Sequence, residues 1–476
     1  MSRRTSSSRR TPGRASWKGR PGLATTVLAF AGLAGITAQA CLIPLVGDLP
    51  ALLGVGPEQA SWAVTLTLIV GAVATPTCGR LADLLGRGRV LLWCLGAATL
   101  GSLLCAVAPG YPLFLTGRAL QGAATAVIPL GISVLSELAS GAALRRGTAL
   151  VSATMGVGTA VGVALGAFVA QVANWQGMFL VVGALCGLAA WGVRALLPRR
   201  AGDGLGGPFD WWGFCTLSVG LTAFLLAVSR GNTWGWAAPR TWGLLAGGVV
   251  TLAVWARIET RTAQPLVDLR ATGTRAMGLV NAASVLTGAA MFLHVLVLPV
   301  LLQAPADERF GAGFSVLAAG LCLVPAGLAI MACAPVGAWL TGRFGHRASL
   351  LAGLAVTVTG YLASVPSLER PWLLVALSAL IGAGVGMVFA TLPAVMHTLS
   401  PPAAVGAANG VNALMRSIGS SLASALAGAI VAATTTASGA VTGFPWLYAM
   451  GAACALGAGC VIAGLPGDAS WGRGRG

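Results

Sequence analysis

The chain has 476 residues, of which 56% are hydrophobic and only 9% are charged, and its mean hydropathy is +0.84. A soluble protein of this length needs many more surface charges, so composition excludes a mainly soluble architecture. The net charge of +17 is spread over a basic start and alternate short links with little aromatic interleaving, which argues against nucleic-acid binding. Repeated apolar runs of about 20 residues instead predict an all-α membrane protein.

The first 22 residues are rich in serine and arginine, and we expect them to form a disordered cytoplasmic tail. Ala38-Gln39-Ala40 resembles a signal-peptide cleavage site. However, the apolar run around it is longer than the apolar region of a signal peptide, and many further runs follow. We therefore predict an uncleaved first membrane helix.

The pattern predicts fourteen transmembrane helices in chain order. They are 23–46, 61–78, 90–108, 112–134, 148–170, 177–196, 211–229, 241–257, 277–302, 312–334, 348–366, 371–395, 405–432 and 444–464. With both termini in the cytoplasm, most of the basic residues fall in cytoplasmic segments, as the positive-inside rule requires. The opposite links hold only four, namely Arg230, Arg240, Arg309 and Arg370.

The stretch Gly79–Arg89 (Gly79-Arg80-Leu81-Ala82-Asp83-Leu84-Leu85-Gly86-Arg87-Gly88-Arg89) separates the second and third predicted helices. Three arginines, one aspartate and three glycines predict a tight, basic, hydrated turn on the cytoplasmic face. A weaker copy, Trp339–Arg347, follows the tenth helix and has Gly345 in the place of Gly86. The offset of eight helices indicates two six-helix halves with two further helices inserted between them.

We therefore divide the chain into a basic cytoplasmic tail, an N-terminal six-helix bundle, an inserted helix pair, a C-terminal six-helix bundle and a short cytoplasmic tail. These are residues 1–22, 23–197, 198–275, 276–465 and 466–476. Two halves related by an axis along the membrane normal, with a site between them near the middle of the membrane, are typical of transporters.

Several motifs in order resemble the major facilitator superfamily. Gly79–Arg89 is similar to its signature loop, Leu115–Gly122 to its helix 4 motif, and Gly158, Gly162 and Gly166 to its helix 5 antiporter motif. Further segments resemble the fourteen-helix drug:proton antiporter branch, namely Asp210–Gly213, Trp234–Trp236, Glu259–Arg261 and Pro265–Leu269. The resemblance runs from about residue 25 to residue 460.

The resemblance implies the major facilitator fold and a monomeric, multi-pass protein of a bacterial inner membrane. It also implies proton-driven export of drugs, antibiotics or similar amphipathic molecules through alternating access, with the small-molecule substrate, protons and lipid as partners and no nucleic acid. Three departures from the family pattern leave the coupling to protons open. Residues 35–40 contain no acidic residue, and Val163 and Ala167 differ from the helix 5 motif. In the second copy of the signature loop, Gly342 occupies the position that corresponds to Asp83. The alternatives are an uncoupled facilitator or importer of a small metabolite, or a non-transporting membrane sensor.

Asp83 is the first candidate for chemistry. An aspartate at a helix end can pair with arginine and with the N-terminus of a neighbouring helix. If that helix belongs to the other half, the contact forms a cytoplasmic latch; the alternative is a topology anchor with solvated charges. The predicted latch residues are Gly79, Arg80, Asp83, Gly86, Arg87 and Arg89.

Arg118 is a candidate for proton coupling, because an arginine inside a membrane helix costs roughly 2.5–3.5 kcal/mol and needs a cavity or a partner. The alternative is a structural arginine bonded to backbone carbonyls. Asp48 and Glu58 flank the outer link between the first two helices and are the nearest candidate proton carriers, or else exposed loop acids. His294 is a further titrating group, or else a packed, hydrogen-bonded histidine.

The remaining candidates concern the substrate cavity and helix packing. The cavity candidates are Gln121, Asn281, Met291, Gln303 and Asn412, with core packing as the alternative for each. Gly158, Gly162 and Gly166 form one smooth face that predicts close helix contact, with control of leak and direction as the functional interpretation. For Arg416 we expect a structural tie.

The sequence lacks the features of an enzyme or an ATP-driven pump. It has no G-x-x-x-x-G-K-[ST] loop, and its sole lysine is Lys18. It has no paired carboxylates, metal cluster or nucleophile triad. We expect no cofactor and no metal.

Overall fold

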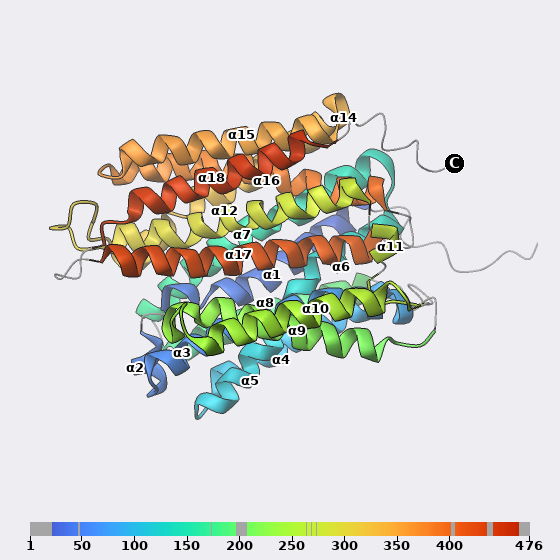
Figure 1. Ribbon diagram of the computed structural model, residues 1–476, viewed down its shortest axis with the longest axis horizontal. Helices are drawn as coiled ribbons and strands as arrows, with labels where there is room; N and C mark the ends of the chain where they lie inside the picture. Colours follow the sequence, from blue (N-terminus) through green and yellow to red (C-terminus); the bar gives the residue numbers. More distant parts are fainter. Residues whose placement is uncertain are drawn as a thin grey trace, which may run out of the picture.

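The computed structural model is a bundle of long helices that run side by side (Figure 1). It describes residues 21–45, 48–172, 174–196, 207–262, 264–267, 269–272, 274–400, 405–435 and 441–465. Within these ranges, fourteen helical stretches are long and apolar enough to cross a membrane. This confirms the predicted number of spans and the all-α membrane fold, whereas most of both predicted tails lies outside the described residues.

The helices of the first part of the chain are α1 (Pro21–Ala40), α2 (Leu49–Leu53), α3 (Pro57–Leu85), α4 (Arg87–Val107), α5 (Tyr111–Gly122), α6 (Val127–Leu138), α7 (Gly141–Val172) and α8 (Trp175–Leu196). Those that follow are α9 (Trp211–Trp234), α10 (Pro239–Glu259), α11 (Leu269–Thr272), α12 (Arg275–Gln303), α13 (Val316–Leu321), α14 (Val324–Phe344), α15 (His346–Ser364), α16 (Pro371–Leu399), α17 (Val405–Thr434) and α18 (Phe444–Ala463).

The expected turn over Gly79–Arg89 is wrong in extent, because α3 continues to Leu85 and α4 begins at Arg87. Leucine, alanine and arginine favour a helix, so charge alone does not end it. Gly86 is the whole link, with φ +101°, a conformation that glycine adopts at little cost. Gly345, with φ +89°, joins α14 to α15 in the same way. The two copies of the motif therefore share a one-residue glycine link.

Two predicted spans are interrupted near their middle, and in the first span the α-helix ends at Ala40, before a 3₁₀ turn at Ile43–Leu45. The fourth span consists of α5 and α6, joined by a 3₁₀ turn at Ala123–Ala126. The tenth span consists of α13 and α14, with Cys322 and Leu323 between them. Helical periodicity predicts such spans as continuous, because each break is only a few residues long and remains apolar.

Buried side chains form three hydrophobic clusters. One is built from α1 to α8, between Leu28 and Val193. The largest is built mainly from α12 to α18, between Met277 and Leu465, with four residues from α1 and α7. In the third, α9 packs with α3, α17 and the segment at Leu266. The division into two halves and an inserted pair agrees with these clusters and remains our interpretation of the chain.

The pair α9 and α10 lies along one side of the bundle (Figure 1). Helix α9 contacts α3 and α17, whereas α10 packs along α9. Arg230, expected in the outer link, lies inside α9 and is only 2% exposed. Its Nη1 donates to Ser61 Oγ at 2.8 Å, and its guanidinium lies 4.5 Å from the centre of the Trp62 ring. This arginine therefore ties α9 to α3.

The outer surface is that of a membrane protein. Large apolar side chains such as Leu188, Val250 and Leu362 are exposed on the flanks of the helices. Exposed tryptophans occur near helix ends, where indole rings favour the boundary between lipid and water; examples are Trp211, Trp212, Trp242, Trp339, Trp372 and Trp446.

Candidate functional site

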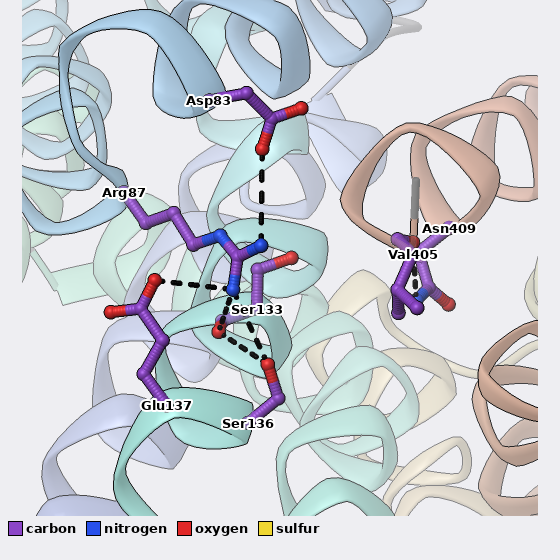
Figure 2. Close-up of polar contacts among 7 residues, drawn as sticks. All are labelled: Asp83, Arg87, Ser133, Ser136, Glu137, Val405 and Asn409. Carbon is purple, nitrogen blue, oxygen red and sulfur yellow. Dashed lines mark hydrogen bonds and ion pairs between the residues drawn. The ribbon is translucent and has the colours of Figure 1, made fainter. Parts of the chain in front are cut away.

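Charged side chains surround the link between α3 and α4 (Figure 2). Asp83 Oδ1 lies 3.9 Å from Arg87 Nη2, and Arg87 Nη1 lies 3.1 Å from Glu137 Oε1 at the end of α6. Arg87 Nη1 also donates to Ser133 O at 3.1 Å and to Ser136 Oγ at 3.4 Å. One guanidinium thus joins the ends of α3, α4 and α6.

This cluster lies beside the beginning of α17. Asp83 and Gly410 line one small cavity of about 260 Å³. A Cβ on Gly410 would lie 3.6 Å from Thr75 O, so α3 and α17 approach closely here. Figure 2 shows Asp83 on one side and the first turns of α17, with Val405 and Asn409, on the other. The first N–H groups of a helix carry partial positive charge, so the beginning of α17 is the kind of group that a nearby carboxylate can attract.

The other charged residues of the signature stretch point elsewhere. Arg80 Nη2 donates to Gln264 Oε1 at 3.3 Å, in the link after α10. Arg89 is exposed. In the second copy, a Cβ on Gly342 would meet nothing within 4 Å. Arg347 Nη2 donates to Ala463 O at 2.6 Å. Of the ion pairs among the described residues, those that involve either copy of the motif lie in the first copy.

Arg118 is 1% exposed and is held by backbone oxygens of two neighbouring helices. Its Nε donates to Ala63 O of α3 at 3.0 Å, and its Nη1 donates to Ala38 O of α1 at 3.2 Å. Nη1 also donates to Gln121 Oε1 at 2.5 Å, and Gln121 Nε2 donates to Ser102 Oγ at 2.7 Å. The ion pairs among the described residues are formed by other arginines, so Arg118 has no carboxylate partner there. Its hydrogen bonds to backbone oxygens are those expected of a structural arginine.

His294 lies in a cavity between α7 and the helices α12, α14 and α16. The cavity is also lined by Thr159, Met291 and Leu323 and is mostly apolar. His294 is 4% exposed, and neither ring nitrogen has a hydrogen-bond partner among the described residues. Its ring stands edge-on to Tyr361, with the centres 6.5 Å apart.

Arg416 lies in a second cavity, lined by α6, α7, α16 and α17. Its Nη1 donates to Asn412 Oδ1 at 2.5 Å. Asn412 Nδ2 in turn donates to Ser284 Oγ at 2.7 Å and to Asn281 Oδ1 at 3.3 Å on α12. The expected tie at Arg416 is therefore present, and it joins α17 to α12. Asn281 and Asn412, two of the cavity candidates, meet in this network.

The glycines of the helix 5 motif face α1. A Cβ on Gly166 would lie 2.0 Å from Cys41 O, and one on Gly162 would lie 2.8 Å from Ala40 Cβ. Thr37 Oγ1 of α1 donates to Gly158 O at 3.3 Å. This face is therefore a packing surface inside the first half.

The opposite face of α7 meets the second half. A Cβ on Gly320 would lie 3.3 Å from Val163 Cγ1 and 3.6 Å from Ala167 Cβ, and one on Gly327 would lie 2.6 Å from Ala160 Cβ. Val163 and Ala167, which depart from the family motif, are therefore interface residues.

Three of the family-like segments meet at one end of the inserted pair. Asp210 Oδ1 accepts from Gly213 N at 2.8 Å at the start of α9. Glu259 accepts from Trp255 Nε1 at 2.9 Å and from Val267 N at 3.3 Å. A Cβ on Gly213 would lie 2.5 Å from Asp210 Oδ2 and 2.7 Å from Glu259 Oε1, which explains the glycine. These motifs fasten α9, α10 and the following link together.

Comparison with known families agrees with this architecture. The family model described as Major Facilitator Superfamily matches residues 28–298 and 280–472. The chain belongs to this superfamily. It is thus a multi-pass member of a family of membrane transporters, which are not enzymes.

Relatives of this superfamily member include bacterial proteins. An uncharacterized MFS-type transporter of Mycobacterium tuberculosis is 28% identical over 83% of this chain and 57% of its own length. The multidrug resistance protein B homolog of that organism is 30% identical over 73% and 65%. Its multidrug resistance protein Stp is 28% identical over 84% and 74%. The chain thus spans less than two thirds of the first two relatives.

A solved structure shows the same fold. The crystal structure of the human organic anion transporter MFSD10 (TETRAN) matches with a TM-score of 0.65 and 16% identity, over 93% of this chain and 99% of the other. At this identity the likeness concerns the fold alone.

Some of the candidate residues of this superfamily member lie apart from these sites. Asp48 is exposed before α2, which fits a loop acid. The side chain of Glu58 lies outside what the structure describes. Gln303 Nε2 donates to Pro299 O at 3.1 Å near the end of α12. Gln121 is buried with Arg118 inside the first half.

Sequence reasoning missed Glu137 and Ser152. Glu137 follows an apolar run. Its position at the end of a predicted span, on the same side of the membrane as the Gly86 link, could have indicated that it pairs with an arginine of that link. Ser152 is 5% exposed and lines the cavity of Arg416, but a serine in an alanine- and glycine-rich helix carries no such signal.

Proposed function

We propose that this transporter exports drugs, antibiotics or similar amphipathic small molecules, driven by inward proton flow through alternating access. The observation that carries the proposal is that Asp83 and Gly410 line one cavity, which places Asp83 beside the first turns of α17 at the boundary between the two halves. Two further cavities lie at the same boundary, between α6 or α7 and the helices α12, α14, α16 and α17. They leave space for these helices to shift relative to one another. The names of the multidrug resistance relatives support drugs as the substrate class.

In this cycle Asp83, Arg87 and Glu137 act as the latch. Arg87 holds the ends of α3, α4 and α6 together, which keeps Asp83 in place beside α17. The attraction between Asp83 and the helix N-terminus stabilises the closed arrangement at this end. Separation of α3 from α17 then opens the molecule toward the cytoplasm.

For the proton we propose His294, because both of its ring nitrogens lack hydrogen-bond partners among the described residues and its ring lies in a cavity between α7 and the helices of the second half. Arg118 acts in this scheme as a clamp that keeps α1, α3 and α5 in register. We expect His294→Ala to keep substrate flux down a gradient but to lose its acceleration by an imposed pH gradient.

The test of export is accumulation of ethidium and a panel of antibiotics in a pump-deficient bacterial host, with and without a protonophore. We expect lower accumulation than in the empty host, and full accumulation after the protonophore is added. Export that persists without a proton gradient would favour the uncoupled facilitator. Unchanged accumulation of every compound would reject the proposed function.

We further propose that the protein lies in a bacterial inner membrane, as a monomer with both termini cytoplasmic. The arginine-rich segments support this orientation. Alkaline phosphatase, which is active only outside the cytoplasm, should be active when fused at residue 306 and inactive at residue 262. The reverse pattern would invert the topology.

A further inference from the structure

The cavity beside Arg416 differs from the cavity of His294 in having a charged hydrogen-bond donor in its lining. Apolar side chains line much of it, including Ile128 of α6, Met155 of α7 and Phe389 of α16. Ser152 of α7 and Arg416 of α17 add polar groups from the two halves of the molecule.

The guanidinium of Arg416 is held in place but not neutralised. Asn412 accepts one of its hydrogen bonds, and the guanidinium carbon lies 5.3 Å from the centre of the Phe389 ring. Its buried Nε has no partner among the described residues, and the ion pairs there involve Arg87 and Arg309 instead. A cation inside a membrane helix without a carboxylate partner is costly, which points to a ligand that supplies the missing negative charge.

Ser152 provides the second, independent observation. It is 5% exposed, and its buried Oγ has no hydrogen-bond partner among the described residues. Its side chain lines the same cavity from the opposite half. A buried hydroxyl without a partner is unfavourable unless a ligand satisfies it. A guanidinium and a hydroxyl together suit a carboxylate or sulfonate.

We propose that this cavity binds amphipathic organic anions, with the acidic group between Arg416 and Ser152 and the apolar body against Phe389 and Met155. This proposal rests on the proposed export function and names its substrate class. Because the two donors belong to different halves, the ligand bridges the halves. Movement of α7 relative to α17 therefore changes the binding of the anion directly.

The test is binding of matched aromatic probes to the purified full chain in phosphatidylcholine nanodiscs. 2-Naphthoate and 2-naphthamide share their ring system and differ in charge. We expect the naphthoate to raise the thermal unfolding midpoint and to bind at least about tenfold more tightly than the amide. Arg416→Gln should abolish this preference, and Arg416→Lys should retain part of it. Equal binding of both probes, or of neither, would overturn the proposal.

Controls separate binding from folding and from transport. Ser152→Ala leaves the contact between Arg416 and Asn412 in place, and we expect it to weaken naphthoate binding several-fold. Arg309→Gln changes an exposed arginine paired with Glu369 and should leave binding unchanged. Unaltered affinity in both Ser152→Ala and Arg416→Gln would overturn the proposal. Displacement of the probe from the protein by phosphatidylglycerol head groups would also overturn it. Export of ethidium without any naphthoate binding would reject the anion site and leave the proposed function standing.

Discussion

At the scale of single residues, Asp83 has the sharpest proposed role. Its side chain is 9% exposed at the boundary between the two halves. We expect Asp83→Asn to lower the export rate about tenfold, equivalent to roughly 1.4 kcal/mol, because the amide loses the charge that attracts α17. The rate should be measured in proteoliposomes, with the inserted amount determined by immunoblot. Arg89→Gln, an exposed change in the same stretch, is the control, and full transport by Asp83→Asn would reject the latch.

Arg118 poses a different question, because a coupling role and a structural role predict different defects. The observed hydrogen bonds to Ala38, Ala63 and Gln121 are those of a clamp. We expect Arg118→Gln to lower the stability of the folded protein by about 3 kcal/mol, since hydrogen bonds from a charged donor are lost in a buried site. The measurement is thermal unfolding in detergent. A variant with unchanged unfolding that has lost proton-driven transport would assign Arg118 to coupling instead.

At the scale of helices, the glycine face of α7 is a close contact with α1. A Cβ at Gly166 would overlap the carbonyl of Cys41, whereas a Cβ at Gly459 in α18 would meet nothing within 4 Å. We expect Gly166→Ala to destabilise the protein by about 1–3 kcal/mol through overpacking and Gly459→Ala to have little effect. Thermal unfolding of both variants checks this. A stable Gly166→Ala protein that leaks protons would favour the functional interpretation of this face.

The sequence predicted the helices well because each span is an apolar run of about 20 residues or more that is bounded by short links with polar or charged residues. It predicted the link at Gly79–Arg89 poorly, because Arg80 and Asp83 are charged residues that nevertheless belong to the helix α3. The backbone conformation shows that Gly86 alone forms the link. It also left the partners of α7 open. One face meets α1 and the other meets α14, but small residues occur on both.

At the scale of the whole molecule, the relation between distant segments decides function, and one sequence contains little information on it. Arg416 was expected to be a structural tie, and the structure adds the cavity that it lines with Ser152, 264 positions away. Pro129 lines both this cavity and the one beside Asp83. The proposed latch and the proposed anion site are therefore neighbours along α6 and α17, so opening of one changes the walls of the other.

This arrangement predicts that fixing α3 to α17 stops the transport cycle. Thr75 and Gly410 line one cavity, and a Cβ on Gly410 would lie 3.6 Å from Thr75 O. Because the two backbones approach this closely, we expect cysteines at both positions to form a disulfide on oxidation. The exposed Cys215 and Cys460 should first be replaced by serine to limit mispairing. We expect the oxidised double variant to lose export and to regain it on reduction, because the cytoplasmic end can no longer open.

The Thr75→Cys single variant is the control for oxidation. If the disulfide forms, as shown by mobility after cleavage between the two halves, and export continues, then separation of α3 from α17 is not part of the cycle.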